Sequence, residues 1–467
     1  MEKPEKIKCV ALPEALGAYA AQEPARFHMP GHKARGMGGF WRDELIGWDV
    51  TELSYTDNLH APSGAILNAQ ERLARAYGAA HSFMSVNGST AAVQAMLLAL
   101  SPDDTLLLSR DAHRAAVSGA ALAGLRTYFI APAYDTENDM YGMVTPEDLD
   151  AALTNTGATA VLLTSPNYLG LTADLAALSR CAKTHGALLL VDAAHGAHFP
   201  FSEALPPGAA GSADMWAHSQ HKTLNALTQA ASLHLGDCRI PPARVLRALA
   251  MVETTSPSYL LMASIDWSVH MARRQNWTAQ VRRCLALERE IAEMPGLSVL
   301  PEHMGAGIAA RDHTRLVIDV SGRGLSGYEA QAMLEKDGIF MEMADSRRLV
   351  LITTPSDDPS WYPRLMQALG RLPRARGCVE PLPPVYAQGA ARLPIREAVF
   401  CRQQSLPLDE APGRIAGEPF GVYPPGVAAC MPGEEITRPL VEGLRLAGER
   451  GAAFFGIRGG CVSVVED

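Results

Sequence analysis

The stretch that decides the fold is Val191–Lys222, which reads VDAAHGAHFPFSEALPPGAAGSADMWAHSQHK. The apolar run just before it, Ala187–Val191, predicts a buried strand that ends at Asp192. Lys222 follows Ser219 in the polar string SQHK at the other end of the stretch. The stretch therefore brings a carboxylate to the end of a strand and a lysine into a hydroxyl-rich turn.

Such a carboxylate and lysine are the two groups that pyridoxal phosphate (PLP) requires. A lysine amine forms a Schiff base with the cofactor aldehyde, and a carboxylate beside the protonated pyridine nitrogen keeps the ring an electron sink. Each residue alone also has an ordinary interpretation, in which Asp192 caps a turn and Lys222 is a solvated lysine. The rest of the chain has to decide between these interpretations.

The composition is that of a globular chain with room for two or three domains, because 48% of its 467 residues are hydrophobic and 19% are charged. The net charge of −9 and the lack of a long basic run argue against nucleic acid as a partner. Eight cysteines without CxxC pairs indicate free thiols in a reducing compartment. No window approaches 18 apolar residues, and the first residues lack a signal-peptide core, so we expect no membrane partner and a cytoplasmic location.

Strands and helices alternate through the first half of the chain. The predicted strands are Thr105–Leu108, Thr127–Ala131 and Ala160–Thr164, and the helices between and after them are Ala115–Ala123, Thr145–Leu153 and Leu175–His185. This order predicts right-handed βαβ units and a mostly parallel sheet covered on both faces. Ligands of such sheets bind at the carboxyl ends of the strands. The polar residues at those ends are His113, Ser165, Asn167 and Asp192.

The string Val86–Thr90, VNGST, separates a predicted strand, Ser82–Val86, from an apolar helix, Ala91–Leu100. Free N–H groups, the helix dipole and two hydroxyls at such a helix start can bind a phosphate. An ordinary N-cap is the alternative, because Ser and Thr are common capping residues.

The histidines have competing interpretations. His113 can stack on a flat cofactor ring or lie in the core as a satisfied imidazole. The group His195, His198, His218 and His221 suggests a metal site, but no cysteine or paired carboxylate completes a zinc set at the usual spacing. We therefore predict no metal.

The second half predicts further units. One long helix is expected over Leu260–Cys284, and strand–helix–strand–strand over 314–353 predicts a compact α+β unit. A Pro- and Arg-rich linker is expected at Arg371–Ala390, after which a helix is expected near Leu393–Arg402. The expected domains are an N-terminal arm and loop (1–60), a large PLP-binding domain (61–300), a small α+β domain (301–370), and a linker with a C-terminal domain (371–467).

Seven motifs together resemble the bacterial Orn/Lys/Arg decarboxylases. They are HMPGHK (His28–Lys33), DVTEL (Asp49–Leu53), VNGST, DAAHGAHF (Asp192–Phe199), SQHKT (Ser219–Thr223), TTSPSYLLMASID (Thr254–Asp266) and YPPG…MPGE (Tyr423–Glu434). The resemblance covers nearly the whole chain in the family's order. It implies the aspartate-aminotransferase-like PLP fold type I: a mostly parallel seven-stranded sheet in a large domain, a small α+β domain and a C-terminal α+β domain. The length resembles the short Gram-positive-type form without an N-terminal wing domain.

The resemblance also implies residue roles. Lys222 would carry PLP covalently, Asp192 would hold the pyridine nitrogen and His113 would stack on the ring, which makes these three the expected catalytic residues. The further cofactor-binding residues would be Gly88, Ser89, Thr90, His195, Ser219 and His221, joined by Thr255 and Ser256 from a neighbouring subunit. The protein is therefore expected to form a homodimer or higher homo-oligomer with shared active sites.

The implied reaction is decarboxylation of arginine, lysine or ornithine to CO2 and a di- or polyamine precursor. Candidate residues for the distal cation of the substrate are Asp57, Glu342 and Glu434, and His113 and Lys222 are candidate proton donors to Cα. The chain departs from the family at Ala193, where an acidic residue is frequent, and at Asp57–Ala61, DNLHA. The alternatives are an aminotransferase or aldolase of the same fold, for which no arginine clamp is evident, and a non-catalytic PLP-binding paralogue.

Overall fold

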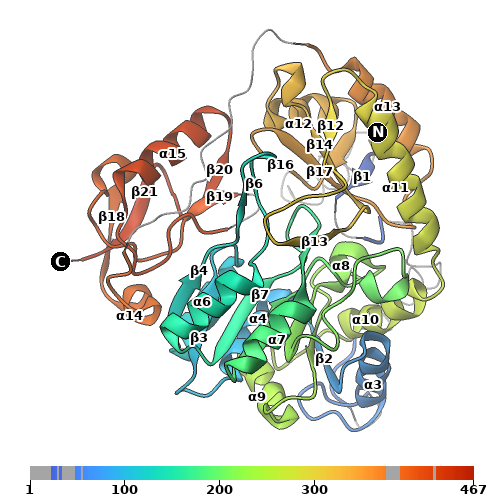
Figure 1. The fold of residues 1–467 in the computed structure, drawn as a ribbon. Coiled ribbons are helices and arrows are strands. Elements are labelled where there is room, and N and C mark those ends of the chain that lie inside the picture. The colour runs from blue at the N-terminus through green and yellow to red at the C-terminus, as the bar shows by residue number, and fades with distance from the viewer. Residues whose placement is uncertain are drawn as a thin grey trace, which may run out of the picture.

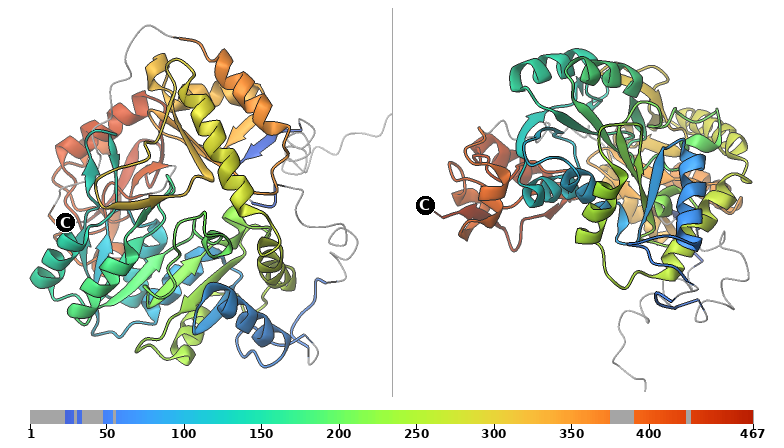
Figure 2. Two further views of the ribbon diagram at one scale, coloured as in Figure 1. Left: turned by 45° about the vertical axis from the view of Figure 1, so that its right-hand side comes forward. Right: turned by 90° about the horizontal axis from the view of Figure 1, so that it is seen from below.

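The computed structural model describes residues 23–28, 31–33, 48–53, 56–374, 390–423 and 427–466. These residues form a large unit around a seven-stranded sheet, a small unit around a four-stranded sheet and a C-terminal unit (Figure 1). The C-terminal unit lies to one side of the other two in Figure 1 and in the right-hand view of Figure 2. Among the described residues, no helix is long and apolar enough to cross a membrane.

The large sheet has the strand order β2-β11-β10-β9-β7-β3-β4. Its strands are β2 (His81–Ser85), β3 (Thr105–Ser109), β4 (Arg126–Ile130), β7 (Ala160–Thr164), β9 (Leu188–Asp192), β10 (Met215–His218) and β11 (Ala231–Leu235). Four neighbouring pairs are parallel, and only β11 runs antiparallel to its neighbours β10 and β2. The predicted mostly parallel seven-stranded sheet is confirmed, although the sequence did not reveal the four-residue strand β10.

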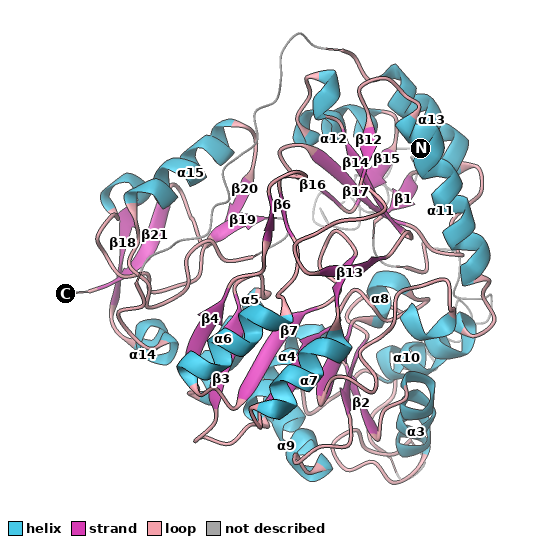
Figure 3. Cartoon of the chain, viewed as in Figure 1, coloured by secondary structure: helices cyan, strands magenta, loops and turns pink. Residues whose placement is uncertain are grey.

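Both faces of the large sheet are covered by helices (Figure 3). Along β3, Leu107 faces one core, whereas Leu106 and Leu108 face the other, as the period of two in a strand requires. The first core contains residues of α3 (Ala65–Tyr77), α6 (Pro146–Thr156), α7 (Leu175–Thr184) and α10 (Tyr259–Ala272). The second contains residues of α4 (Gly88–Leu98), α5 (Arg114–Ala123), α9 (Pro242–Val252) and α14 (Ile395–Phe400).

The predicted single helix over Leu260–Cys284 is wrong. The structure has α10 (Tyr259–Ala272), a break, and α11 (Trp277–Ala292). The side chain of Asn276 accepts a hydrogen bond from the N–H of Ala279 and so caps a new helix start. Leu287 of α11 packs in the core of the small unit rather than beside the large sheet.

The small unit has the sheet order β12-β14-β17-β16. Its elements are β12 (Ser298–Val299), β14 (Arg315–Asp319), α12 (Gly327–Lys336), β15 (Ile339–Met341), β16 (Met343–Ala344), β17 (Arg348–Ile352) and α13 (Trp361–Arg371). Near the start of the chain, β1 (Ala25–Phe27) pairs with β15 in parallel. The predicted strand–helix–strand–strand pattern is confirmed, with its middle strand divided into β15 and β16.

Two short pairs join the two larger units. The hairpin of β5 (Tyr134–Asp135) and β6 (Met140–Tyr141) extends toward the small unit, and β8 (Leu171–Ala173) pairs with β13 (Ile308–Arg311) (Figure 1). The C-terminal unit contains α14, β18 (Gln403–Pro407), β19 (Gly421–Tyr423), α15 (Arg438–Glu449), β20 (Ala453–Phe455) and β21 (Cys461–Val465). The helix expected near Leu393–Arg402 is thus present as α14.

Candidate active site

The candidate site lies at the carboxyl edge of the large sheet. Because β2 is antiparallel to β11, which is antiparallel to β10, the carboxyl end of β2 meets those of the parallel strands at this edge. A cavity of about 290 Å³ opens there. It is lined by six of the predicted site residues, namely Ser89, Thr90, His113, Asp192, His195 and Lys222. Segments more than one hundred residues apart in the sequence thus meet at one place.

Lys222 lies in α8 (Gln220–Thr223), the short helix that follows β10. Its Nζ is 2.9 Å from Nε2 of His195 and lies 5.7 Å from the ring centre of Tyr168. Burial lowers the pKa of the Lys222 ammonium below its ordinary value, against the opposing effect of the Asp192 charge. A lysine with these surroundings is suited to act as a nucleophile rather than as a solvated charge.

The turn that carries Lys222 is fixed by the HMPGHK segment. The N–H of Gly31 donates to the carbonyl of His221 at 2.7 Å. A Cβ on Gly31 would lie 2.5 Å from the carbonyl carbon of Thr223, so only glycine fits there. The Nζ of Lys33 is buried and donates to the carbonyls of His28 and Ile352. This motif therefore acts by backbone contact with the lysine turn.

Asp192 and His113 flank the cavity. Asp192 is the last residue of β9, is 5% exposed and accepts a hydrogen bond from the N–H of Ala194 at 3.1 Å. His113 caps α5, because its Nδ1 accepts from the N–H of Ala115 at 3.2 Å. Burial lowers the pKa of His113, so that the ring is neutral. The capping and cofactor interpretations of His113 are therefore compatible, since the ring also lines the cavity.

The predicted phosphate group of residues is divided between the cavity and its surroundings. Helix α4 begins at Gly88, whose φ of 76° is left-handed, so Ser89 and Thr90 lie in the first turn, earlier than the sequence predicts. Ser219 is fully buried, and its Oγ lies 3.2 Å from Nδ1 of His221, which is also 3.2 Å from the carbonyl of Ala230. Gly88, Ser219 and His221 lie beside the cavity rather than among its lining residues.

The three candidates for the distal substrate cation lie outside the cavity lining. Asp57 is occupied by backbone N–H groups of Ser63, Gly64 and Ile66 at the start of α3. Burial would raise the pKa of Asp57, but these hydrogen bonds lower it to about 2. Glu434 is 2% exposed and forms a two-pronged ion pair with Arg110. The half-buried Glu342 lies near enough to Lys222 to stabilise its charged form.

Thr255 and Ser256 are exposed on the surface of the chain, in the loop before α10. The loop at Asp57–His60 lies against them, because Nε2 of His60 is 2.9 Å from the carbonyl of Thr254 and the Tyr259 hydroxyl donates to the carbonyl of Asp57. Neither Thr255 nor Ser256 reaches the cavity of its own chain.

The cavity also contains residues that the sequence did not single out. Asp111 lies just after β3 and is partly buried, and burial together with the nearby Asp192 charge raises its pKa to about 6, against a hydrogen bond from Ser109. The other end of the cavity is lined by Tyr134 and Asp139 of the β5–β6 hairpin and by Asp345 and Arg348 of the small unit. These four come from a hairpin and a second sheet, so no strand-end pattern marks them. Tyr168 had a usable signal, since it directly follows the strand-end string Ser165–Asn167.

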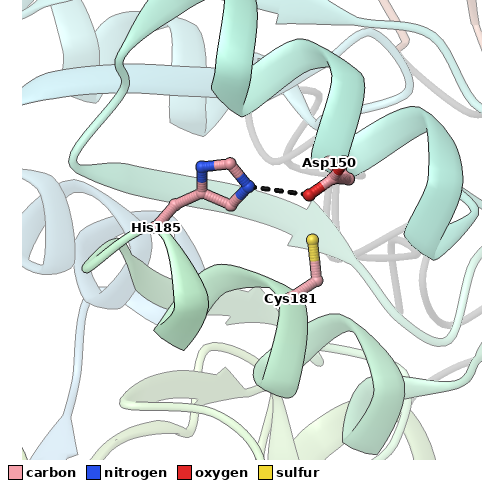
Figure 4. A group of neighbouring side chains, drawn as sticks. All are labelled: Asp150, Cys181 and His185. Atoms are coloured by element: carbon pink, nitrogen blue, oxygen red, sulfur yellow. Dashed lines mark hydrogen bonds and ion pairs between the residues drawn. The ribbon is translucent and has the colours of Figure 1, made fainter.

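The four histidines considered for a metal have separate partners. His198 bonds Asp312 and Thr314, and His218 bonds His234. His195 bonds Lys222, and His221 bonds Ser219 and the carbonyl of Ala230. Among the described residues, a different group, Asp150, Cys181 and His185, has its potential ligand atoms within 4.8 Å of one another (Figure 4). There Nε2 of His185 lies 2.8 Å from Oδ1 of Asp150, which is an ordinary hydrogen bond between α6 and the end of α7.

The fold is similar to that of solved enzymes. The constitutive lysine decarboxylase of Escherichia coli matches with a TM-score of 0.74 and 18% identity, over 97% of this chain and 81% of that one. An alanine–glyoxylate aminotransferase from Nostoc matches with a TM-score of 0.54 and 16% identity, over 71% of this chain and 91% of that one. The aminotransferase-like fold brings a buried lysine, a carboxylate and a helix start to one cavity, which is the arrangement that a PLP-dependent enzyme requires.

Sequence comparison narrows this class to one family. The family description "Orn/Lys/Arg decarboxylase, major domain" matches residues 11–299, and the C-terminal domain of the same family matches residues 388–459. An arginine decarboxylase of Bacillus subtilis is 33% identical over 441 residues, which cover 90% of each chain. The chain belongs to the Orn/Lys/Arg decarboxylase family and is a PLP-dependent decarboxylase of a basic amino acid, as the seven motifs predict.

Proposed function

We propose that this chain decarboxylates arginine, with lysine and ornithine as the competing substrates, and that Lys222 holds PLP covalently. The observation that carries the proposal is the placement of the Lys222 amine and the Asp192 carboxylate in one cavity with His113. The comparison with arginine decarboxylases supports arginine, because relatives so named are 33% and 32% identical over 90% of this chain. The product would be the corresponding amine, in which a proton replaces the carboxylate.

The cavity residues fit PLP in type and position. The start of α4 offers backbone N–H groups and the hydroxyls of Ser89 and Thr90 to a phosphate. Asp192 offers a carboxylate to a pyridinium N–H, and the neutral ring of His113 offers a face to an aromatic ring. Gly88, Ser219, His221 and His195 complete the proposed set.

When bound, PLP supplies the electron sink that accepts the Cα–carboxylate bonding electrons as CO2 leaves. Asp192 would keep the pyridine nitrogen protonated, because a buried carboxylate favours the positive charge. The burial of the cavity walls would exclude water from Cα. The proton that Cα receives would come from Lys222 Nζ or His113 Nε2, the two groups proposed to move it.

The lining charges support a cationic substrate. Asp111, Asp139 and Asp345 line the cavity together with Asp192, and Arg348 is the one arginine among the described residues that line it. An acidic end remote from Lys222 would attract the distal group of a basic amino acid. Asp57 and Glu434 lie outside the cavity lining, whereas Asp139 and Asp345 line the cavity and Glu342 lies near Lys222, so these three are the proposed candidates for this contact.

We further propose a cytoplasmic homodimer or higher homo-oligomer in which Thr255 and Ser256 approach the partner's cofactor. Both residues are exposed, and Met251 and Leu67 on the nearby α9 and α3 leave 68% and 37% of their surfaces exposed. Exposed apolar side chains around a hydroxyl-rich loop are suited to an interface. We also propose the domain limits 61–300 and 301–370. Helix α11 falls within the first range by its residue numbers, although its Leu287 and Ile291 pack in the core of the small unit.

The test is CO2 release by purified, PLP-loaded protein with arginine, lysine and ornithine in parallel, with the amine product identified. Lys222→Ala should abolish release and the visible absorption of bound cofactor, because no other amine lies in the cavity lining. Lys183→Ala, at an exposed lysine, is the matched control and should behave as wild type. Unchanged activity in Lys222→Ala would reject the assignment. Cofactor absorption without CO2 release from any of the three would indicate another PLP reaction.

A further inference from the structure

A chain of three side chains connects the small unit to the candidate lysine. Arg315 is the first residue of β14, and its guanidinium Nη2 lies 3.0 Å from Nδ1 of His195. On the other side of the same ring, Nε2 lies 2.9 Å from Nζ of Lys222. Arg315 and His195 are 1% and 3% exposed, so water does not compete for these contacts.

The donor and acceptor roles in this chain follow from Arg315. A guanidinium has only N–H donors, so Nδ1 of His195 must accept with its lone pair. A neutral imidazole that accepts at Nδ1 carries its proton on Nε2, and that N–H faces Lys222. Nζ of Lys222 must therefore accept, which only a neutral amine can do, because an ammonium has no lone pair.

The surrounding charges are compatible with this assignment. Burial, with the Arg315 charge, holds the pKa of His195 well below its ordinary value, so the ring is neutral beside a neutral Lys222. Burial also lowers the pKa of Lys222. The charges of Asp192 and Glu342 raise this pKa, and the charge of Arg315 lowers it. The other titratable groups that face this chain are His113 at the start of α5, His221 of α8, Tyr168 after β7 and Asp312 before β14.

We propose that Arg315 is a positioning residue that fixes the Nε2–H tautomer of His195 and thereby holds Lys222 as a neutral amine. The inference rests on the proposed role of Lys222 as the cofactor-bearing lysine. A neutral Nζ would offer its lone pair to the aldehyde carbon of the cofactor, and its two amine hydrogens would leave with the aldehyde oxygen as water. Because Arg315 belongs to the small unit and His195 to the large one, the contact of the two units controls whether Lys222 can react.

The first test reads the tautomer directly in the apo-protein. The 15N shifts of histidine-labelled protein distinguish protonated from unprotonated ring nitrogens, and the His195→Asn spectrum identifies the signals of His195. We expect a protonated Nε2 and an unprotonated Nδ1. A protonated Nδ1 in wild type would overturn the proposal, and this measurement needs no change at Arg315.

The second test measures the titration of Lys222 in apo-protein by competitive acetylation across pH, with exposed Lys183 as the internal reference. Arg315→Met should raise the pH midpoint of Lys222 acetylation. Each pH unit of rise reduces the fraction of neutral Lys222 at pH 7 tenfold, and it should slow PLP uptake in the same proportion. Arg315→Lys, which keeps a charged donor, should restore the wild-type midpoint. Arg311→Met, which removes another buried arginine of the same region, is the matched control and should leave the midpoint unchanged.

The two readouts together separate the tautomer from the loss of one charge. In Arg315→Met the ring proton should move to Nδ1, so that Nε2 accepts from a Lys222 ammonium. A folded Arg315→Met with an unmoved midpoint, or a shifted midpoint with the proton still on Nε2, would overturn the proposal. Both measurements use apo-protein without substrate, so they do not depend on decarboxylase activity. A failure to release CO2 would refute the proposed function, whereas the tautomer and titration measurements alone decide this inference.

Discussion

Glu434→Gln tests whether the MPGE motif holds the fold or the substrate. Glu434 receives hydrogen bonds from Arg110 at 2.5 and 3.0 Å and from the N–H of Met431 at 2.8 Å. Its side chain is 2% exposed and that of Arg110 is 11% exposed, so the pair is shielded from solvent. Arg110 directly follows β3 of the large sheet, and the pair therefore joins the C-terminal unit to the edge of the candidate site.

The expected cost follows from leaving the Arg110 charge buried. Glutamine has nearly the shape of glutamate, but its amide group presents N–H donors to the guanidinium and carries no charge. Removing one partner of a buried ion pair lowers the free energy of unfolding by about 3–5 kcal/mol. Glu435→Gln is the matched control, because its partner Arg392 is 56% exposed and such surface pairs contribute only about 0–1 kcal/mol.

The assay is urea unfolding of both variants, followed by hydrogen exchange over the C-terminal unit and by KM for the amino acid. We expect Glu434→Gln to lower the free energy of unfolding and to loosen the C-terminal unit, with KM unchanged in the folded protein. Equal stability of the two variants would refute the ion-pair reasoning. A raised KM without loss of stability would instead assign Glu434 to the substrate.

Two further predictions concern the backbone and the pH dependence of the site. Gly31→Ala should weaken PLP binding at least about tenfold, because a Cβ would lie 2.5 Å from the carbonyl carbon of Thr223 and displace the lysine turn. The absorbance of bound cofactor measures this loss. Gly370→Ala is the control and should bind PLP as wild type does, because no atom lies within 4 Å of a Cβ placed there. The folded pKa of Asp111, raised to about 6 by burial, lies above its unfolded value of 3.8, so its stabilising contribution is complete below about pH 4 and is lost as pH rises through 6. Asp111→Asn should therefore remove a decline of about 2 kcal/mol between pH 4 and 7 in the apo-protein, measured by urea midpoints. A variant that keeps the wild-type slope would contradict this assignment.

The sequence predicted the large unit well because its signals are local. The apolar runs at Ala160–Thr164 and Ala187–Val191 have the length and composition of buried strands, and the observed β7 and β9 match them within one residue. The helix expected from Thr145 is present as α6, and the side chain of Thr145 caps it by accepting from the N–H of Asp148. The strand β10 was missed because four residues give too short a run for its period to be recognised.

The predictions that failed or stayed incomplete depend on long-range contacts. The helix over Leu260–Cys284 has continuous apolar periodicity, and its break becomes evident only where α11 turns to pack against the small unit. Asp57 and Glu434 were selected as carboxylates in motifs, yet neighbouring N–H groups and Arg110 already bond them. Composition alone does not show which carboxylates are already paired.

The sequence by itself determined the fold class, the family and the candidate lysine–aspartate pair, because strand period, cap residues and motif order are properties of contiguous residues. Only the tertiary structure decided which side chains share the cavity and which state they hold. Tyr134, Asp139 and Asp345 reach it from a hairpin and a second sheet, and Arg315 reaches His195 across 120 positions of the chain. A hydrogen bond between segments that are distant in the sequence depends on how the two units pack. The pattern of residues along the chain does not specify that packing.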